Sequence, residues 1–191
     1  GHEELRAALL AAPKWGDDDE RADRWALAWQ RHRGELLREL ESEEGCPRLL
    51  MEMVVRSLHH LEGRSLGATP DGRRSGEPLA DSIGPVLGTS REGPTAILNS
   101  VRRLEPARHW PGGYNLNLTL PVTDWGGPEM AGRLLALIEV FFGSGGQELQ
   151  INCLDSAVLR EARQHPERHP DLMVRIAGFN ALFVKLSSRE Q

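Results

Sequence analysis

The chain has 191 residues, which is long enough for one domain with a sizeable apolar core. Apolar residues make up 39% and charged residues 27% of the sequence, so its composition is neither that of a disordered chain nor that of a collagen-like one. The formal net charge is -5 with both signs interspersed, which argues against nucleic acid as a partner. No apolar stretch approaches the ~20 residues of a membrane-spanning helix, and the first residues lack a signal-peptide pattern, so we expect a cytoplasmic protein with no membrane partner.

Helical periodicity dominates the first third of the chain. Residues 3–12 and 21–42 are rich in Ala, Leu, Glu and Arg with apolar positions at helical spacing, and the loop 13–19 separates them. A third helix is expected over 48–61, where apolar residues recur on one side. Residues 63–95 then lose all apolar periodicity and are rich in Gly, Pro, Asp, Arg and Ser, so an ordered loop and a linker are both open at this point.

The second half of the chain predicts a strand–helix–strand crossover. We expect, in chain order, a helix at 93–104, a strand at 115–120, a helix at 129–142, a strand at 148–154, a helix at 156–164 and an extended run at 172–176. Pro94 suits the first turn of its helix, and the strict alternation of polar and apolar residues at 115–120 is typical of a half-buried strand. The glycine-rich turn 143–146 ends the apolar helix before the next strand.

A glycine follows the last extended run. Taken alone, Gly178 would more often supply a turn with positive φ than chemistry. Its surroundings change this interpretation, because residues 172–184 read LMVRIAGFNALFV and resemble the glycyl radical loop, usually written R-V-[AST]-G-Y. Ile176 and Phe179 replace the commoner Val and Tyr, and both keep size and apolarity. Further blocks resemble the same family in the same order, at 12–19, 68–81, 93–96 and 147–152.

The chain therefore resembles, over nearly its whole length, the C-terminal glycyl radical portion of a glycyl radical enzyme of the pyruvate formate-lyase-like family. The resemblance implies an α/β fold class, namely the last strands, helices and radical loop of a ten-stranded α/β barrel that is incomplete on its own. It implies a helical segment from the barrel's outer region at 1–62 and a glycyl radical domain at 63–191, with the radical loop around 172–184. The 63–95 segment is then an ordered loop.

By the same resemblance, Gly178 is the catalytic residue, and Arg175 and Phe179 support its loop. A separate iron–sulfur activating enzyme uses S-adenosylmethionine to remove one Cα hydrogen, so the radical is a modification of Gly178 and not a bound cofactor. Glycine suits this role because it has no Cβ to crowd the flattened radical carbon. Oxygen cleaves such a radical, which implies anaerobic metabolism and a buried loop.

The family's relay cysteine has no match in this sequence. In relatives it lies in a loop before the region matched here, whereas Cys46 follows an acidic helix and Cys153 lies in a predicted strand, where free cysteines usually pack. We therefore expect part of a lyase, decarboxylase or dehydratase that is inactive without a cysteine-loop portion. Its partner would be that N-terminal portion or a second copy. A non-catalytic radical-domain protein that docks onto or repairs a larger partner stays open, as does an excised part of a longer enzyme.

We expect no bound metal or cofactor. The adjacent His59 and His60 point in different directions on a helix, and no carboxylate follows them at a zinc-binding offset. Arg73 lies in a loop with charges of both signs, and internal charge pairing is the commoner role for an arginine in such a setting. We therefore interpret Arg73 as structural.

Overall fold

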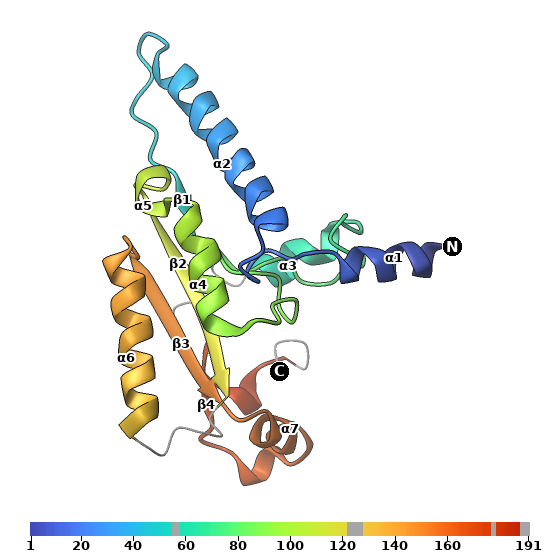
Figure 1. The fold of residues 1–191 in the computed structure, drawn as a ribbon. Coiled ribbons are helices and arrows are strands. Elements are labelled where there is room, and N and C mark those ends of the chain that lie inside the picture. Colours follow the sequence, from blue (N-terminus) through green and yellow to red (C-terminus); the bar gives the residue numbers. More distant parts are fainter. Residues whose placement is uncertain (55–57, 122–127, 177–178, 188–191) are drawn as a thin grey trace.

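The computed structural model describes residues 1–54, 58–121, 128–176 and 179–187, and it shows an α/β fold with helices around a short parallel sheet (Figure 1). The α-helices are α1 (His2–Ala11), α2 (Glu20–Glu41), α3 (Leu58–Ser65), α4 (Gly93–Arg103), α5 (Pro106–His109), α6 (Pro128–Gly143) and α7 (Ser156–Gln164). The strands are β1 (Glu52–Met53), β2 (Gly113–Pro121), β3 (Glu148–Leu154), β4 (Met173–Ile176) and β5 (Phe179–Leu182). Short 3-10 turns are η2 (Pro166–Arg168) and η3 (Phe183–Lys185). Among the described residues, none of these helices combines the length and apolarity that crossing a bilayer requires.

The strands form two separate sheets. In the first, β1, β2 and β3 lie side by side in parallel, and the register of β2 with β3 runs from Asn115 opposite Glu148 to Pro121 opposite Leu154. In the second, β4 and β5 form an antiparallel pair. Because α6 connects two parallel neighbours, β2, α6 and β3 make the predicted crossover unit, which is confirmed.

The main core lies between the sheet and the helices α4 and α6. Alternation along β2 directs Leu116, Leu118 and Leu120 to one face, and all three are buried. Leu98 of α4 and Phe141 of α6 belong to the same apolar cluster. Figure 1 shows both helices running beside β2 and β3, so the leucine face of the sheet is the face that these helices cover.

The turn after α6 is fixed by close packing on Phe141. Gly146 N donates a hydrogen bond to Phe141 O at 2.9 Å, and a side chain at position 146 would collide with the Phe141 ring. The Tyr114 hydroxyl at the start of β2 donates to Gly145 O at 2.9 Å, and burial raises the pKa of Tyr114 to about 12. These contacts hold the end of the crossover helix beside the start of the neighbouring strand.

Buried polar contacts attach the base of α2 to α4. Asp23 is buried, accepts a hydrogen bond from Ser100 Oγ at 3.0 Å and forms an ion pair with Arg103. The hydrogen bond from Arg103 to Asp23 raises the pKa of the guanidinium above its usual value, so Arg103 remains charged. Beyond this base, α2 rises away from the sheet, as Figure 1 shows.

The expected helix over 48–61 is wrong in its first half. β1 occupies Glu52–Met53, and α3 begins only at Leu58. Gly112 N donates to Met51 O at 2.8 Å, and a Cβ on Gly112 would lie only 2.7 Å from that oxygen. A glycine therefore lets the two backbones approach, and pairing with a distant strand outweighs the local helical periodicity.

The loop after α3 is ordered, as the family resemblance implied. Arg73 is structural, as predicted, but among the described residues its side chain bonds carbonyl oxygens and a hydroxyl and not the carboxylates that charge pairing requires. The side chain of Arg73 is buried and donates to Glu77 O at 2.6 Å and to Thr69 Oγ1 at 3.1 Å. Lys14 Nζ donates to Asp71 O at 2.6 Å, which joins the α1–α2 connection to the same loop. This segment lacks an apolar face that could order it by packing. Hydrogen bonds from cationic side chains to backbone carbonyls order it instead.

We predict that Leu116→Ala lowers the free energy of unfolding by about 2–5 kcal/mol, because the leucine is fully buried and its loss leaves a cavity. Leu135→Ala on α6 is the control, since Leu135 is 56% exposed and its truncation should cost less than about 1 kcal/mol. Urea unfolding followed by tryptophan fluorescence measures both values. Equal losses for the two variants would contradict the assignment of the leucine face to the core.

Candidate functional site

The face of the sheet opposite the leucines carries polar side chains. Along β2 these are Asn117 and Thr119, and the register places them opposite Gln150 and Asn152 of β3. Parallel strands usually carry apolar side chains on both faces, so amides here indicate that other polar groups pack against this face.

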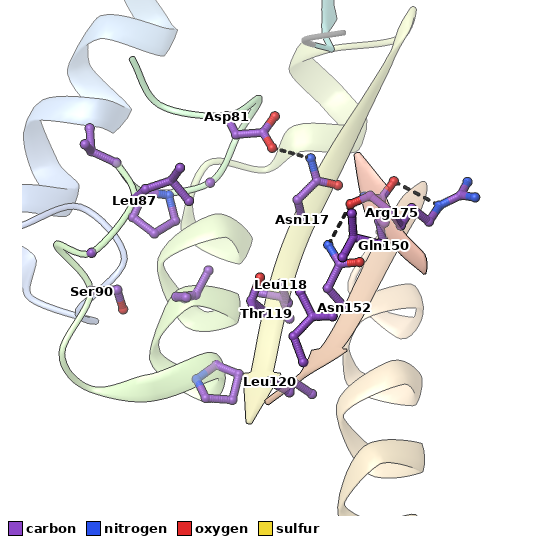
Figure 2. A pocket seen from close by; sticks show the side chains of 18 of the residues that line it. Asp81, Leu87, Ser90, Asn117, Leu118, Thr119, Leu120, Gln150, Asn152 and Arg175 are labelled. Carbon is purple, nitrogen blue, oxygen red and sulfur yellow. Dashed lines mark hydrogen bonds between the residues drawn. The ribbon is translucent and has the colours of Figure 1, made fainter. Parts of the chain in front are cut away.

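A hairpin lies over the β3 side of this polar face. It consists of β4 and β5, with Arg175 opposite Asn180 and Ile176 opposite Phe179. Arg175 Nε donates to Gln150 Oε1 at 3.2 Å, and Asn152 Nδ2 donates to the Arg175 carbonyl oxygen at 3.2 Å, as Figure 2 shows. Both bonds from β3 therefore end on one residue of the hairpin.

The predicted site residues lie at this hairpin to the extent that the structure describes them. Arg175 is an exposed residue of β4, and Phe179 begins β5, although its side chain lies outside the description. Gly178 itself lies outside the described residues. The structure thus brings Arg175 to Gln150 and Asn152, two residues to which the sequence assigned no role.

A cavity of about 640 Å³ separates the hairpin from the loop that precedes α4. Polar and apolar side chains are mixed on all its walls, and the polar residues include His59, Asp81, Asn117, Gln150, Asn152 and Arg175. Asp81 connects the loop with the sheet, because its Oδ2 accepts a hydrogen bond from Asn117 Nδ2 of β2 at 2.7 Å (Figure 2). The polar face is therefore bonded to the loop through β2 and to the hairpin through β3.

His59 of α3 is the buried titratable group of the cavity wall. Only 4% of its surface is exposed, and among the described residues its Nδ1 has no hydrogen-bond partner. Burial is the largest effect and lowers the pKa of His59, while the Asp81 carboxylate opposes this shift and His60 adds to it. His59 is therefore neutral at pH 7, and its Nδ1 is a buried nitrogen to which no described group forms a hydrogen bond.

Neither cysteine belongs to the cavity wall. Cys46 and Cys153 are free thiols, and Cys153 is exposed on β3. Among the residues that the structure describes, no three His, Cys, Asp or Glu side chains gather closely enough to bind a metal ion. Among the described residues, the polar groups that line the cavity are accordingly amides, hydroxyls, imidazoles, one carboxylate and one guanidinium.

Comparisons with known proteins identify the family of this hairpin and sheet. A family model described as glycine radical matches residues 79–184. The probable dehydratase YbiW of Escherichia coli K12 is 34% identical over 197 residues, which cover 100% of this chain and 24% of that protein. The indoleacetate decarboxylase of Tractidigestivibacter scatoligenes is 32% identical over 185 residues, covering 96% of this chain and 21% of that protein.

A solved structure agrees with these relatives. The enzyme of 1,2-propanediol dehydration from Roseburia inulinivorans superposes with a TM-score of 0.86 at 33% identity, covering 98% of this chain and 23% of that one. The chain belongs to the glycine radical family, and it corresponds to the C-terminal portion of glycyl radical enzymes such as decarboxylases and dehydratases. It spans about a fifth to a quarter of the length of these relatives. The predicted fold class, an α/β portion of the glycyl radical enzyme barrel, is confirmed.

Sequence reasoning overlooked the residues that hold the hairpin. The block 147–152 resembles the family, but this likeness alone gives Gln150 and Asn152 no role. A usable signal was the amide alternation on both predicted strands, because polar side chains on one face of a parallel pair need partners.

We predict that His59 makes the chain less stable as the pH falls. Its folded pKa is below the ordinary value of 6.5, so the unfolded chain binds the proton more readily between these two pKa values, and stability decreases as the pH falls below about 6.5. His59→Gln cannot titrate and should lose this part of the pH dependence. Urea midpoints of both proteins at pH 7.5 and 5.5 measure it, and an identical pH dependence of the two would contradict the prediction.

Proposed function

We propose that this chain is the radical-bearing portion of a glycyl radical enzyme, with Gly178 as the site at which the radical is stored. The observation that carries the proposal is the match of the family model to 79–184, which includes the hairpin that presents Arg175 beside the polar cavity. A separate activating enzyme would use S-adenosylmethionine to remove one hydrogen atom from the Cα of Gly178.

Glycine chemistry supports this assignment. An unpaired electron on Cα is shared with the adjoining amide groups only when that carbon flattens, and a residue without Cβ does so at the least steric cost. Arg175 and Phe179 flank Gly178 on the two paired strands, and cross-strand pairing would hold both ends of the loop. Because oxygen would cleave the backbone at the radical, an anaerobic and reducing cytoplasm suits such a protein.

The same proposal divides the chain into two regions. Residues 1–62 would belong to the outer helical region of the complete enzyme, and residues 63–191 would form the radical domain. The ion pair of Asp23 with Arg103 joins the two regions, so they would act as one unit. Strands β2 to β5 all lie after residue 63, whereas strand β1 and the cavity residues His59 and His60 would come from the first region.

Substrate turnover would require a cysteine from a second polypeptide portion. In the proposed cycle, the stored radical takes a hydrogen atom from that cysteine, and the resulting thiyl radical takes one from the substrate. Cys46 and Cys153 do not line the cavity, which favours a relay cysteine from elsewhere. The reaction would be a radical elimination or decarboxylation, as in the named relatives.

We predict that anaerobic incubation with the cognate activating enzyme and S-adenosylmethionine gives a doublet in the electron paramagnetic resonance spectrum. Gly178→Ala should abolish it, because the substituted Cα carries a methyl group that crowds the flat radical. Gly143→Ala is the matched control, since a Cβ at Gly143 meets no atom within 4 Å. A doublet that survives in Gly178→Ala would refute Gly178 as the radical site.

We also predict that the activated chain alone consumes no substrate, because its radical has no cysteine positioned to relay hydrogen-atom abstraction. Addition of a polypeptide with the cysteine loop should start turnover of either 1,2-propanediol or indoleacetate, which represent the two reaction types among the relatives. Product formation under anaerobic conditions measures this. Turnover by the chain alone would refute the need for a second portion, and a radical that forms without turnover in any combination would favour a non-catalytic docking protein.

A further inference from the structure

We propose that Gln150 and Asn152 are positioning residues that hold the radical-bearing hairpin on β3. Two side chains on one face of the strand, two residues apart, both bind Arg175. We call these two hydrogen bonds to Arg175 the clamp. Arg175 lies three positions before Gly178, so a role of the clamp in radical storage rests on the function proposed above. The clamp itself, however, is a property of the chain before any radical forms.

The clamp matters because no backbone ladder joins the hairpin to the sheet within the described residues. β4 and β5 pair with each other and form a sheet separate from β1, β2 and β3. Val174 of β4 packs in one apolar cluster with Ala162 of α7 and with Phe183 of η3, the turn that follows the hairpin. Apolar packing of this kind is not directional, whereas hydrogen bonds fix which residue of β4 lies beside which residue of β3.

The chemistry of the two bonds determines how each amide is oriented. An arginine Nε only donates, so Gln150 must present its oxygen to Arg175; a carbonyl oxygen only accepts, so Asn152 must present its NH₂ group. Gln150 therefore acts as an acceptor and Asn152 as a donor, although both carry the same functional group. A carboxylate could replace the first amide but not the second.

The clamp reaches both strands that flank Gly178. Asn152 bonds to the backbone of Arg175 and so restrains the main chain of β4 directly. Arg175 Nη1 also donates to Asn180 Oδ1 of β5 at 3.3 Å, in addition to the strand pairing of the same two residues. The hydrogen bonds from β3 therefore fix Arg175 of β4, and Arg175 in turn fixes Asn180 of β5, on the other side of Gly178.

The test compares amide-to-acid substitutions at the two positions. On the full 191-residue chain without activation, hydrogen exchange of the amides of β4 and β5 is measured at pH 7 relative to those of α4. We expect Gln150→Glu to keep exchange within about twofold of wild type, because its carboxylate still accepts from Arg175. We expect Asn152→Asp and Gln150→Leu to accelerate hydrogen exchange of the hairpin amides about fivefold or more. Each substitution removes one hydrogen bond to Arg175, and the free energy of one such bond corresponds to about a fivefold change in the opening equilibrium.

Asn117→Asp is the matched control. Asn117 lies in register with Gln150 on the same face, yet its Nδ2 donates to Asp81, and it has no hydrogen bond to the described residues of the hairpin. Its substitution brings two carboxylates together and should loosen the loop at Asp81 while hairpin exchange stays at the wild-type rate. If Asn152→Asp weakens α4 as well, Asn152→Ala repeats the test without the added charge.

The outcomes decide between the clamp and simpler explanations. Wild-type hairpin exchange in both Gln150→Leu and Asn152→Asp would overturn the proposal. Equally slowed hairpin exchange in Gln150→Glu and Asn152→Asp would also overturn the proposal. That result would show that any negative charge near Arg175 holds the hairpin, whichever residue carries it. Faster hairpin exchange in Asn117→Asp would show that any loss of an amide on this face has the same effect, and it would overturn the clamp too.

A second measurement separates this proposal from the proposed function. After activation, the electron paramagnetic resonance signal of Asn152→Asp should decay several-fold faster than that of wild type, while Gln150→Glu should match wild type. If wild type acquires no radical, the proposed function fails while the exchange experiment still tests the clamp. If exchange follows the predicted order but the decay rates are equal, the hairpin is clamped without protecting the radical, and the positioning role is refuted.

Discussion

The amide side chains on one face of the β2–β3 pair constrain everything that packs against it. A buried amide left without a partner costs about 1–3 kcal/mol, so the buried Gln150 requires a complementary group, and the half-buried Asn117 gains from one. Asp81 meets this need on β2, and Arg175 meets it on β3. The loop and the hairpin therefore lie over the polar face at defined positions, and the cavity is the space that remains between them.

The two faces of the sheet are held to their neighbours by different interactions. The leucine face packs on α4 and α6 by apolar burial, which contributes about 25 cal/mol per Å² and tolerates small shifts. Hydrogen bonds on the polar face depend on distance and angle, and a shift of one residue would break them. Stability is thus supplied mainly by one face and register by the other. If the hairpin presents Gly178 as proposed, its position would depend on this register, and the hairpin lies on the amide side.

Local pattern was sufficient to predict the crossover but not the site. The alternation at 115–120 predicts β2, and the apolar run at 129–142 predicts α6, because these elements follow their own periodicity. β1 could not be predicted, since Glu52 and Met53 are extended only through pairing with a distant strand. Likewise, the sequence indicates amides on β2 and β3 but does not reveal their partners, because those partners come from distant segments. The family resemblance indicated Gly178, and the physical setting of that residue lies outside the described part of the chain.

The long helix α2 carries apolar surface that this chain does not bury. Trp25 and Trp29 are 67% and 61% exposed, whereas Asp23 and Gln30 on the same helix are buried. Adjacent exposed aromatics are typical of surface that another polypeptide covers, and the aligned dehydratase continues well beyond the 23% matched here. Helix α2 contributes no residue to the cavity wall. Assembly with a second portion and storage of the radical would therefore depend on different parts of the chain, so either could change without disturbing the other.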